Sequence, residues 1–185
     1  ATILSQNTSD KNSGPAFARL KQAFPTWDAA ADASAPALAR QIRAAGIANV
    51  KSKRIKNILS HLRRRRGKPS LDFLKRLPTS AAREYLANLP GVGPKTVACV
   101  LMFGFGLPVL PVDTHVLRVS IRLGLVPAGT GADKAHRLLQ EQVADRLVYP
   151  FHALLIEHGR KRCTARRPDC KGCTLSRLCP SAFEV

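Results

Sequence analysis

The chain has few acidic residues, few aromatic residues and no long apolar segment. Its 185 residues include 12 Asp and Glu against 30 Lys and Arg, and aromatic side chains make up 5% of the total. No apolar run approaches the roughly 20 residues that a membrane-spanning helix needs. The formal net charge of +18 exceeds what solubility requires, and an excess of this size most often serves a polyanion. Nucleic acid is therefore the expected partner, with a merely basic, ribosomal-type surface and an anionic membrane as alternatives.

The chain also lacks an initiating methionine, since it starts at Ala1. Residues 1–4 read like the middle of a helix rather than its beginning. We therefore expect that an N-terminal piece precedes them, so a missing targeting segment carries no conclusion.

Strand patterns are nearly missing from the sequence. Apolar residues recur at helical spacing almost throughout, which predicts an all-α fold. Stop signals predict that helices over residues 36–45, 50–66 and 151–158 end at the glycines that follow them. These glycines are Gly46, Gly67 and Gly159.

The one strand-like run covers residues 107–112 and contains two prolines, which do not fit inside a sheet. We interpret it as a connector. The sequence therefore predicts a multi-helix domain over residues 1–107 and a smaller helical domain over residues 108–185.

A short glycine-rich motif is the strongest local signal. Residues 89–96 read Leu-Pro-Gly-Val-Gly-Pro-Lys-Thr. Gly91 and Gly93 can adopt backbone conformations that other residues avoid, so a tight turn through Val92 can aim amide N–H groups at an anion. The motif predicts a hairpin between two helices, within about residues 80–103, that can hold a DNA backbone.

Lys95 follows the hairpin directly and is a candidate nucleophile. A lysine has an ordinary pKa of about 10.4 and attacks only as the free amine. Pro94 suits the first turn of a helix, which would place Lys95 where the positive end of the helix dipole disfavours an ammonium. A plain phosphate-contacting lysine is the alternative.

A second motif, Val-Asp-Thr-His, occupies residues 112–115. Asp113 precedes a helix predicted over residues 114–123 and suits its N-cap. A carboxylate at this place could also stabilise positive charge on a sugar whose base departs, and relay protons for the lysine. His115 could be a core residue, a phosphate contact or a support for the site, and a structural role is favoured.

Four of the five cysteines form one local cluster near the end of the sequence. Two disulfides are disfavoured because they suit a small secreted protein better than a basic helical chain. Zinc usually takes two short Cys-x-x-Cys pairs, and only one occurs here, so the spacing favours an iron–sulfur cluster over zinc without excluding zinc. The four candidate ligands are Cys163, Cys170, Cys173 and Cys179. Cys99 lies apart on an apolar helix and is expected to pack.

Two basic segments are candidate DNA contacts. Arg166 and Arg167 lie between the first two clustered cysteines, where a metal-stapled loop would display them to phosphates or where they would only offset an anionic cluster. Residues 51–68 carry nine Lys and Arg around one apolar stripe. For this run a solvated helix face and direct phosphate contact are equally good interpretations.

Together, residues 89–96, 112–115 and 158–179 resemble the endonuclease III branch of the helix-hairpin-helix (HhH-GPD) DNA glycosylases. The resemblance covers nearly the whole chain. It implies a six-helix barrel domain that carries the hairpin, a second helical domain with a four-iron four-sulfur cluster, and a DNA-binding cleft between them that receives a flipped base. The family's first helix, which joins the second domain, has no counterpart in this sequence.

The resemblance also implies roles for individual residues. Lys95 would attack the deoxyribose C1′ with help from Asp113, and the resulting Schiff base would permit β-elimination. The four clustered cysteines would ligate the iron–sulfur cluster.

Base flipping leaves a gap in the stack, and the resemblance implies which residues fill it. Asn7 would plug the gap with Gln6 beside it, and Ile47 would act as a wedge from the other side. Family members commonly carry glutamine where this chain has Asn7 and a basic residue where it has Pro94.

The sequence therefore predicts a base excision repair enzyme, a bifunctional DNA glycosylase and abasic-site lyase for damaged, oxidised pyrimidines. We expect an intracellular, DNA-associated monomer, in the cytoplasm or nucleoid if bacterial, that binds duplex DNA and no membrane. A sister-branch adenine or thymine mismatch glycosylase is the nearest alternative, although those relatives typically lack a lysine at position 95. A catalytically silent DNA-binding module is the alternative from another class.

Overall fold

The computed structural model describes residues 1–184, and this part of the chain contains helices and no strand, which confirms the all-α prediction. None of the described helices is long and apolar enough to cross a membrane. Contacts divide the chain into two compact units, one ending at Gly93 and the other starting at Pro94. This division lies before the predicted boundary at residue 107, because Met102 belongs to the core of the second unit.

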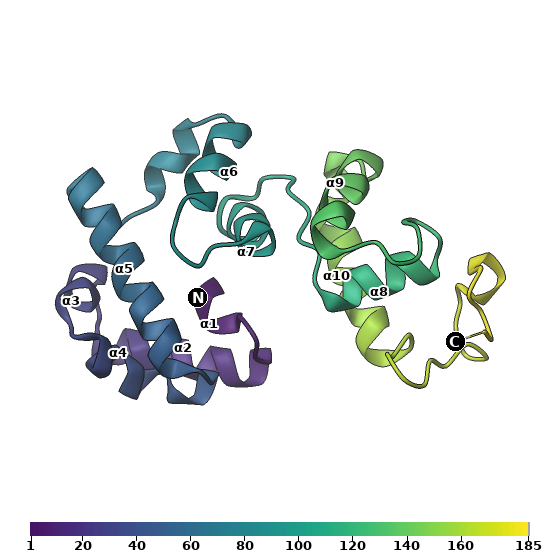
Figure 1. Cartoon of the computed structure of the whole chain (residues 1–185), viewed down its shortest axis with the longest axis horizontal. Helices are drawn as coiled ribbons and strands as arrows, with labels where there is room; N and C mark the ends of the chain where they lie inside the picture. Colours follow the sequence, from purple (N-terminus) through teal and green to yellow (C-terminus); the bar gives the residue numbers. More distant parts are fainter. Residues whose placement is uncertain (185) are drawn as a thin grey trace. The chain divides into compact units, whose positions relative to one another are not determined.

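The first unit is built around its longest helix, α5. Helices α3 and α4 pack along α5 (Figure 1), and the buried core includes Leu20, Leu38 and Ile42. The helix α5 ends at Gly67, which adopts a left-handed conformation with φ 74°, as the stop signal predicts. The α-helices of this unit are α1 (Thr2–Ser5), α2 (Asp10–Ala23), α3 (Trp27–Asp32), α4 (Ala35–Gln41), α5 (Ala48–Arg66) and α6 (Thr79–Ala87), with 3-10 turns η1 (Arg43–Ala45) and η2 (Asp72–Arg76).

Several basic side chains of α5 have partners inside this unit. The Lys56 amine donates to the backbone carbonyls of Ala31 and Ala33, 2.5 and 2.7 Å away, at the end of α3. Arg63 pairs with Asp32 at 2.6 Å, and the Arg66 guanidinium lies 3.9 Å from the centre of a phenylalanine ring in η2. The basic run is thus neither wholly a solvated face nor wholly a phosphate-binding surface, because part of its charge stabilises helix C-terminal ends.

The second unit packs its helices around a core that includes Val116, Val119, Leu139 and Leu155. Helices α8 and α10 lie side by side (Figure 1). The helices are α7 (Pro94–Cys99), continued by the π-helical turn η3 (Val100–Gly104), then α8 (Thr114–Arg122), α9 (Ala132–Gln142), η4 (Asp145–Leu147), α10 (Val148–Lys161) and η5 (Ser176–Leu178).

The segment of residues 107–112 is a connector, as predicted, and not a strand. Its backbone N–H and C=O groups form hydrogen bonds with side chains, where a strand would pair with a neighbouring strand. The Gln140 amide accepts from the N–H of Leu110 at 2.8 Å and donates to the carbonyl of Pro108 at 3.0 Å. The connector is therefore fixed from α9, and it leads directly into the first turn of α8.

The prediction that a helix ends at Gly159 is wrong. Helix α10 continues through Gly159 to Lys161. A Cβ added to Gly159 would lie 3.0 Å from the Cβ of His115 and 3.1 Å from the Arg118 guanidinium on α8. This glycine serves close helix packing, and a sequence alone does not distinguish that use from a stop signal.

We expect Gly159→Ala to destabilise the protein by about 1–3 kcal/mol, because the added methyl group forces α8 and α10 apart. Gly14→Ala is the matched control, since Gly14 lies in α2 and an added Cβ would meet no atom of another element within 4 Å. That substitution should change the free energy of unfolding by less than about 0.5 kcal/mol, because the better helix propensity of alanine is offset by its crowding against the following Pro15. Urea unfolding of both variants measures the difference, and equal effects would contradict the packing role of Gly159.

Candidate active site and cysteine loop

The predicted hairpin is a six-residue loop between α6, which ends at Ala87, and α7, which begins at Pro94. Gly91 has φ 73°, and an added Cβ would lie 2.6 Å from the Cδ of Arg54. Both features require glycine at this position. The N–H of Val92 donates to the carbonyl of Leu89 at 3.2 Å and closes the turn, so this amide serves the loop itself.

Lys95 lies in the first turn of α7, directly after the N-terminal proline of this helix. Its side chain is half-buried, whereas the next four residues are buried. Its amine lies close enough to the Cys99 thiol, one helical turn later, to lower the pKa of that thiol. Burial raises the pKa of the Cys99 thiol, and the nearby Lys95 partly opposes that increase. Cys99 therefore packs against the candidate nucleophile and lies outside the cysteine loop.

Asp113 caps α8, as predicted. Its Oδ1 accepts hydrogen bonds from the backbone N–H groups of His115 at 2.9 Å and Val116 at 2.8 Å. Both cap bonds end on one oxygen, so Oδ2 takes no part in the cap. A carboxylate can thus start this helix and still present an oxygen to another group.

The structure brings Lys95 and Asp113 to the same neighbourhood within the second unit. Their charges both act on the Cys99 thiol and on the His152 imidazole. The two residues are far apart in sequence and are carried by the first turns of different helices. The arrangement combines an amine and a carboxylate, as covalent catalysis by a lysine requires.

His152 belongs to this site and was missed in the sequence. It lies on α10, is 4% exposed, and its Nδ1 lies 2.8 Å from the carbonyl of Pro111. Because a carbonyl only accepts, Nδ1 carries a hydrogen, and Nε2 is an acceptor in the neutral imidazole. Burial lowers the pKa of His152, although Pro111 and Asp113 act the other way. The only signal in the sequence that could have identified His152 is its place among the apolar positions of a helix. The same placement is typical of a core residue.

Two exposed aromatic rings lie beside His152. Phe103 is 59% exposed and Tyr149 is 60% exposed. Their ring centres are 6.2 Å apart in a T-shaped arrangement, and the Phe103 ring lies 5.6 Å from the imidazole of His152. Exposed aromatic faces are typical of surfaces on which a base stacks.

His115 lies where α8 crosses α10. Its Nδ1 is 3.2 Å from a guanidinium nitrogen of Arg118, and its Cβ faces Gly159. These contacts fit the structural role that the sequence favours for His115.

None of the five cysteines forms a disulfide, and the four clustered ones line a single pocket of about 30 Å³ that opens to solvent. Within the described part of the chain, no group of three or more His, Cys, Asp or Glu side chains is arranged to hold a metal ion. A zinc ion needs four sulfurs at about 2.3 Å from one point, whereas an iron–sulfur cluster spreads its four thiolates around a larger body.

Two arginines of α8 hold the beginning of the cysteine loop, a role that sequence reasoning missed and for which helical spacing was the only signal. Arg118 donates to the carbonyls of Gly159 and Cys163, both at 2.8 Å. Arg122 donates to the carbonyl of Thr164 at 2.7 Å and to the Cys163 sulfur at 3.2 Å. Donors to the sulfur of a thiolate stabilise its negative charge.

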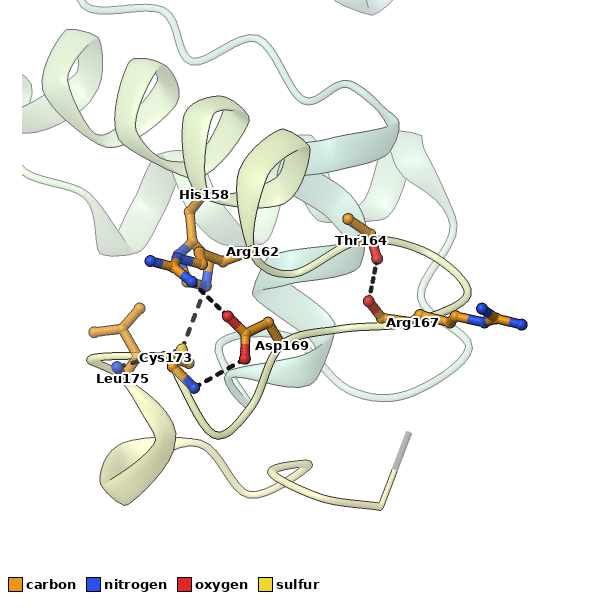
Figure 2. A network of polar contacts seen from close by, with 8 residues as sticks. His158, Arg162, Thr164, Arg167, Asp169, Cys173 and Leu175 are labelled. Carbon is orange, nitrogen blue, oxygen red and sulfur yellow. Dashed lines mark hydrogen bonds and ion pairs between the residues drawn. The ribbon is translucent and has the colours of Figure 1, made fainter.

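The rest of the loop is held by its own contacts (Figure 2). Arg162 pairs with Asp169, which also accepts from the N–H of Gly172 at 2.9 Å. The Gly172 N–H and Arg162 hold the pKa of Asp169 below its usual value. The imidazole of His158 lies 3.7 Å from the Cys173 sulfur.

The predicted DNA contacts Arg166 and Arg167 are both exposed on this loop. The hydroxyl of Thr164 donates to the backbone carbonyl of Arg167 at 2.6 Å, while the Arg167 side chain extends away from the cysteine (Figure 2). The loop thus fixes the backbone at Arg167 and leaves its guanidinium exposed to solvent.

The predicted plug and wedge residues have unusual backbone conformations. Asn7 has φ 52° and Ile47 has φ 40°, and with Phe183 they are the non-glycine residues with positive φ among residues 1–184. Asn7 is exposed, and Ile47 is 51% exposed. A β-branched residue in this region is strained, and such strain gathers at functional sites.

Comparison with known proteins gives a consistent set of relatives. A family model described as "HhH-GPD superfamily base excision DNA repair protein" matches residues 1–145. The chain is 32% identical to endonuclease III of Sulfolobus acidocaldarius over 97% of its own length and 78% of that protein. It is 35% identical to endonuclease III of Thermotoga maritima over 97% of its length and 79% of that protein.

A plant relative is more similar in sequence but considerably longer. The chain is 40% identical over 85% of its length to a protein of Arabidopsis thaliana whose name assigns it provisionally to the DNA glycosylases, and it spans 54% of that protein. Among solved structures, a trapped endonuclease III–DNA covalent intermediate matches with a TM-score of 0.85 and 28% identity, over 98% of this chain and 81% of that one.

The Asp113 cap can be tested by stability measurements. We expect Asp113→Ala to lower the free energy of unfolding by about 1 kcal/mol, because the N–H groups of residues 115 and 116 lose their acceptor. Asp113→Asn should leave stability nearly unchanged, since asparagine caps as well as aspartate. Thermal and urea unfolding check both; equal losses in the two variants would show that the carboxylate charge, and not the cap, stabilises α8.

Proposed function

The chain belongs to the HhH-GPD superfamily of base excision DNA repair proteins, in its endonuclease III branch, and we propose that it is a bifunctional DNA glycosylase and abasic-site lyase. Its substrate is duplex DNA with damaged bases, in particular oxidised pyrimidines. One observation carries this proposal: Lys95, in the first turn of α7, and the capping Asp113 act on the same two neighbours. A silent DNA-binding module has no use for that combination.

In the proposed reaction, the lone pair of the Lys95 amine attacks C1′ of the damaged nucleotide. The bond between C1′ and the base breaks, and the base leaves with its electrons and takes up a proton. Opening of the sugar ring gives an iminium between the lysine nitrogen and C1′. Removal of a proton from C2′ then expels the 3′ phosphate oxygen, which nicks the strand on the 3′ side of the damaged site.

Asp113 supports this reaction through its second carboxylate oxygen. As the base departs, positive charge develops on the sugar, and a fixed carboxylate stabilises it. The same oxygen can accept a proton from the lysine. The two cap hydrogen bonds on Oδ1 keep the group in place while this occurs.

The Schiff base predicts a covalent adduct. Borohydride should trap the protein on a duplex that contains an abasic site, and Lys95→Ala should abolish the adduct because no amine replaces it. Lys134→Ala is the matched control, since it removes an exposed lysine of the same unit and should trap as the native protein does. The adduct is measured by its retarded migration in a denaturing gel.

Asp113→Asn adds a second comparison in the same assay. It keeps the cap, so slower trapping by this variant reports the chemistry of the carboxylate. Native protein that binds the duplex but neither traps nor nicks it would support the binding-module alternative instead.

We further propose that the cysteine loop holds a four-iron four-sulfur cluster. Cys163, Cys170, Cys173 and Cys179 line one cavity, and Arg122 already donates to one of the sulfurs. The cluster would supply structure and no reacting group. It would fix the loop that displays the two exposed arginines.

Purified protein should contain iron and acid-labile sulfide in equal amounts, and Cys170→Ser should lower both. Cys99→Ser is the matched control, because that thiol is buried beside Lys95 and lies outside the loop, so its iron content should stay that of the native protein. Elemental analysis and the visible absorption band measure the outcome. Zinc without iron would overturn the proposal.

The proposed function also implies which residues contact DNA. The exposed glycines Gly91 and Gly93 would receive the phosphate backbone at the hairpin, and Arg166 and Arg167 would contact phosphates from the cysteine loop. Asn7 and Ile47 would enter the base gap. The protein would act on duplex DNA as a monomer.

A further inference from the structure

Lys51 is the largest fully buried side chain of the protein, with 0% exposure. Its amine donates to the carbonyl of Leu4 at 2.8 Å and to the carbonyl of Ala45 at 2.7 Å. Burial lowers the pKa of this amine. A buried ammonium is costly unless it is fully hydrogen-bonded, so the position must serve a purpose that an apolar side chain would not.

The two carbonyls that Lys51 binds stand next to the predicted base-gap residues. Leu4 lies in α1, which ends just before Asn7. Ala45 ends η1, and Ile47, two residues later, is the N-cap residue of α5. One nitrogen therefore connects two short helices, and the plug and the wedge each lie two residues beyond the end of one of them.

Arg54 makes a second connection one turn further along α5. Its guanidinium donates to the side-chain oxygen of Gln6 at 2.8 Å, and the side-chain nitrogen of Gln6 donates to the carbonyl of Gly91 at 3.0 Å. The Arg54 stem also occupies the space where a Cβ on Gly91 would lie. The segment before Asn7 is thus linked to both α5 and the hairpin.

These connections explain how strained residues keep their conformations. Asn7 and Ile47 both have positive φ, and such residues persist only where the surrounding structure determines them. Exposed side chains offer little of that support, since Asn7 and Ile47 point to solvent. The support comes instead from backbone neighbours that Lys51 and Arg54 hold.

We propose that Lys51 and Arg54 are positioning residues that hold Asn7 and Ile47 in the conformations in which they enter the base gap. Gln6 belongs to this brace and does not itself enter the gap. The proposal rests on the proposed function, because it concerns the filling of the space that a flipped base leaves. A preformed plug and wedge avoid the ordering cost that a mobile loop incurs when it binds.

The test compares Lys51→Met and Arg54→Met with Lys53→Met. Methionine keeps an apolar stem and removes the charge, and Lys53 is an exposed residue of the same helix. It therefore measures the general effect of one lost positive charge. The readouts are binding to a duplex with a tetrahydrofuran abasic analogue, binding to the undamaged duplex, and fluorescence of 2-aminopurine placed opposite the analogue.

We expect Lys51→Met and Arg54→Met to reduce the preference for the abasic duplex by about ten- to a hundredfold and to weaken the 2-aminopurine signal. Lys53→Met should lower both affinities together and keep the preference within about twofold. An unchanged preference in a folded Arg54→Met variant overturns the proposal, whether or not Lys51→Met folds.

Gln6→Met separates the brace from direct contact with the gap. A brace residue should affect all four bases opposite the analogue equally. A loss of binding confined to one opposite base would overturn the assignment of Gln6 to the brace. It would indicate that Gln6 contacts the base gap directly.

Borohydride trapping on single-stranded abasic DNA distinguishes this proposal from the proposed function. That substrate needs Lys95 but has no gap to fill. Lys51→Met and Arg54→Met should therefore trap on it as the native protein does, and their failure to do so while folded would assign them to the chemistry and overturn the brace. If the native protein fails to trap on the abasic duplex as well, the lyase assignment is wrong, while the binding comparison still decides the role of the brace.

Discussion

The cap that Asp113 makes on α8 is the interaction on which the second unit depends. It sets the start of the helix directly after the connector, so the directions of all later residues of α8 follow from it. Arg118 and Arg122 then lie on one face, where they bind the carbonyls of residues 159–165. The same face meets Gly159 of α10. One carboxylate thus fixes the candidate active site and, through two arginines, the start of the cysteine loop.

The excess of positive charge has more than one use. Lys51, Lys56 and Arg118 all donate to backbone carbonyls at or near the ends of helices. Such carbonyls carry partial negative charge and need donors. Part of the positive charge that indicates DNA binding in the sequence therefore stabilises the fold instead. The exposed arginines of the cysteine loop are the better candidates for phosphate contact, because their guanidinium groups extend from a backbone that is already fixed.

The sequence predicted features that depend on local chemistry. Gly67 ends α5 and Asp113 caps α8, because stop and cap signals act within one turn of a helix. It failed where distant elements meet. A glycine such as Gly159 looks the same in the sequence whether it ends a helix or allows close packing against another helix, here α8. His152 and Lys51 are held in place by hydrogen bonds to backbone carbonyls that are distant in sequence. Because every residue has a backbone carbonyl, the sequence does not indicate which ones accept these bonds.

The cap of Asp113 leaves room for the role that we propose for this residue in the reaction. If the cap used both oxygens, a catalytic role would compete with stability, and protonation or movement of the carboxylate would loosen α8. Both cap bonds instead end on Oδ1. The second oxygen is then positioned by the fold without being used by it. The rigidity that catalysis needs is thus the same rigidity that starts the helix, which is why the interpretations of Asp113 as a cap and as a catalytic group do not exclude each other.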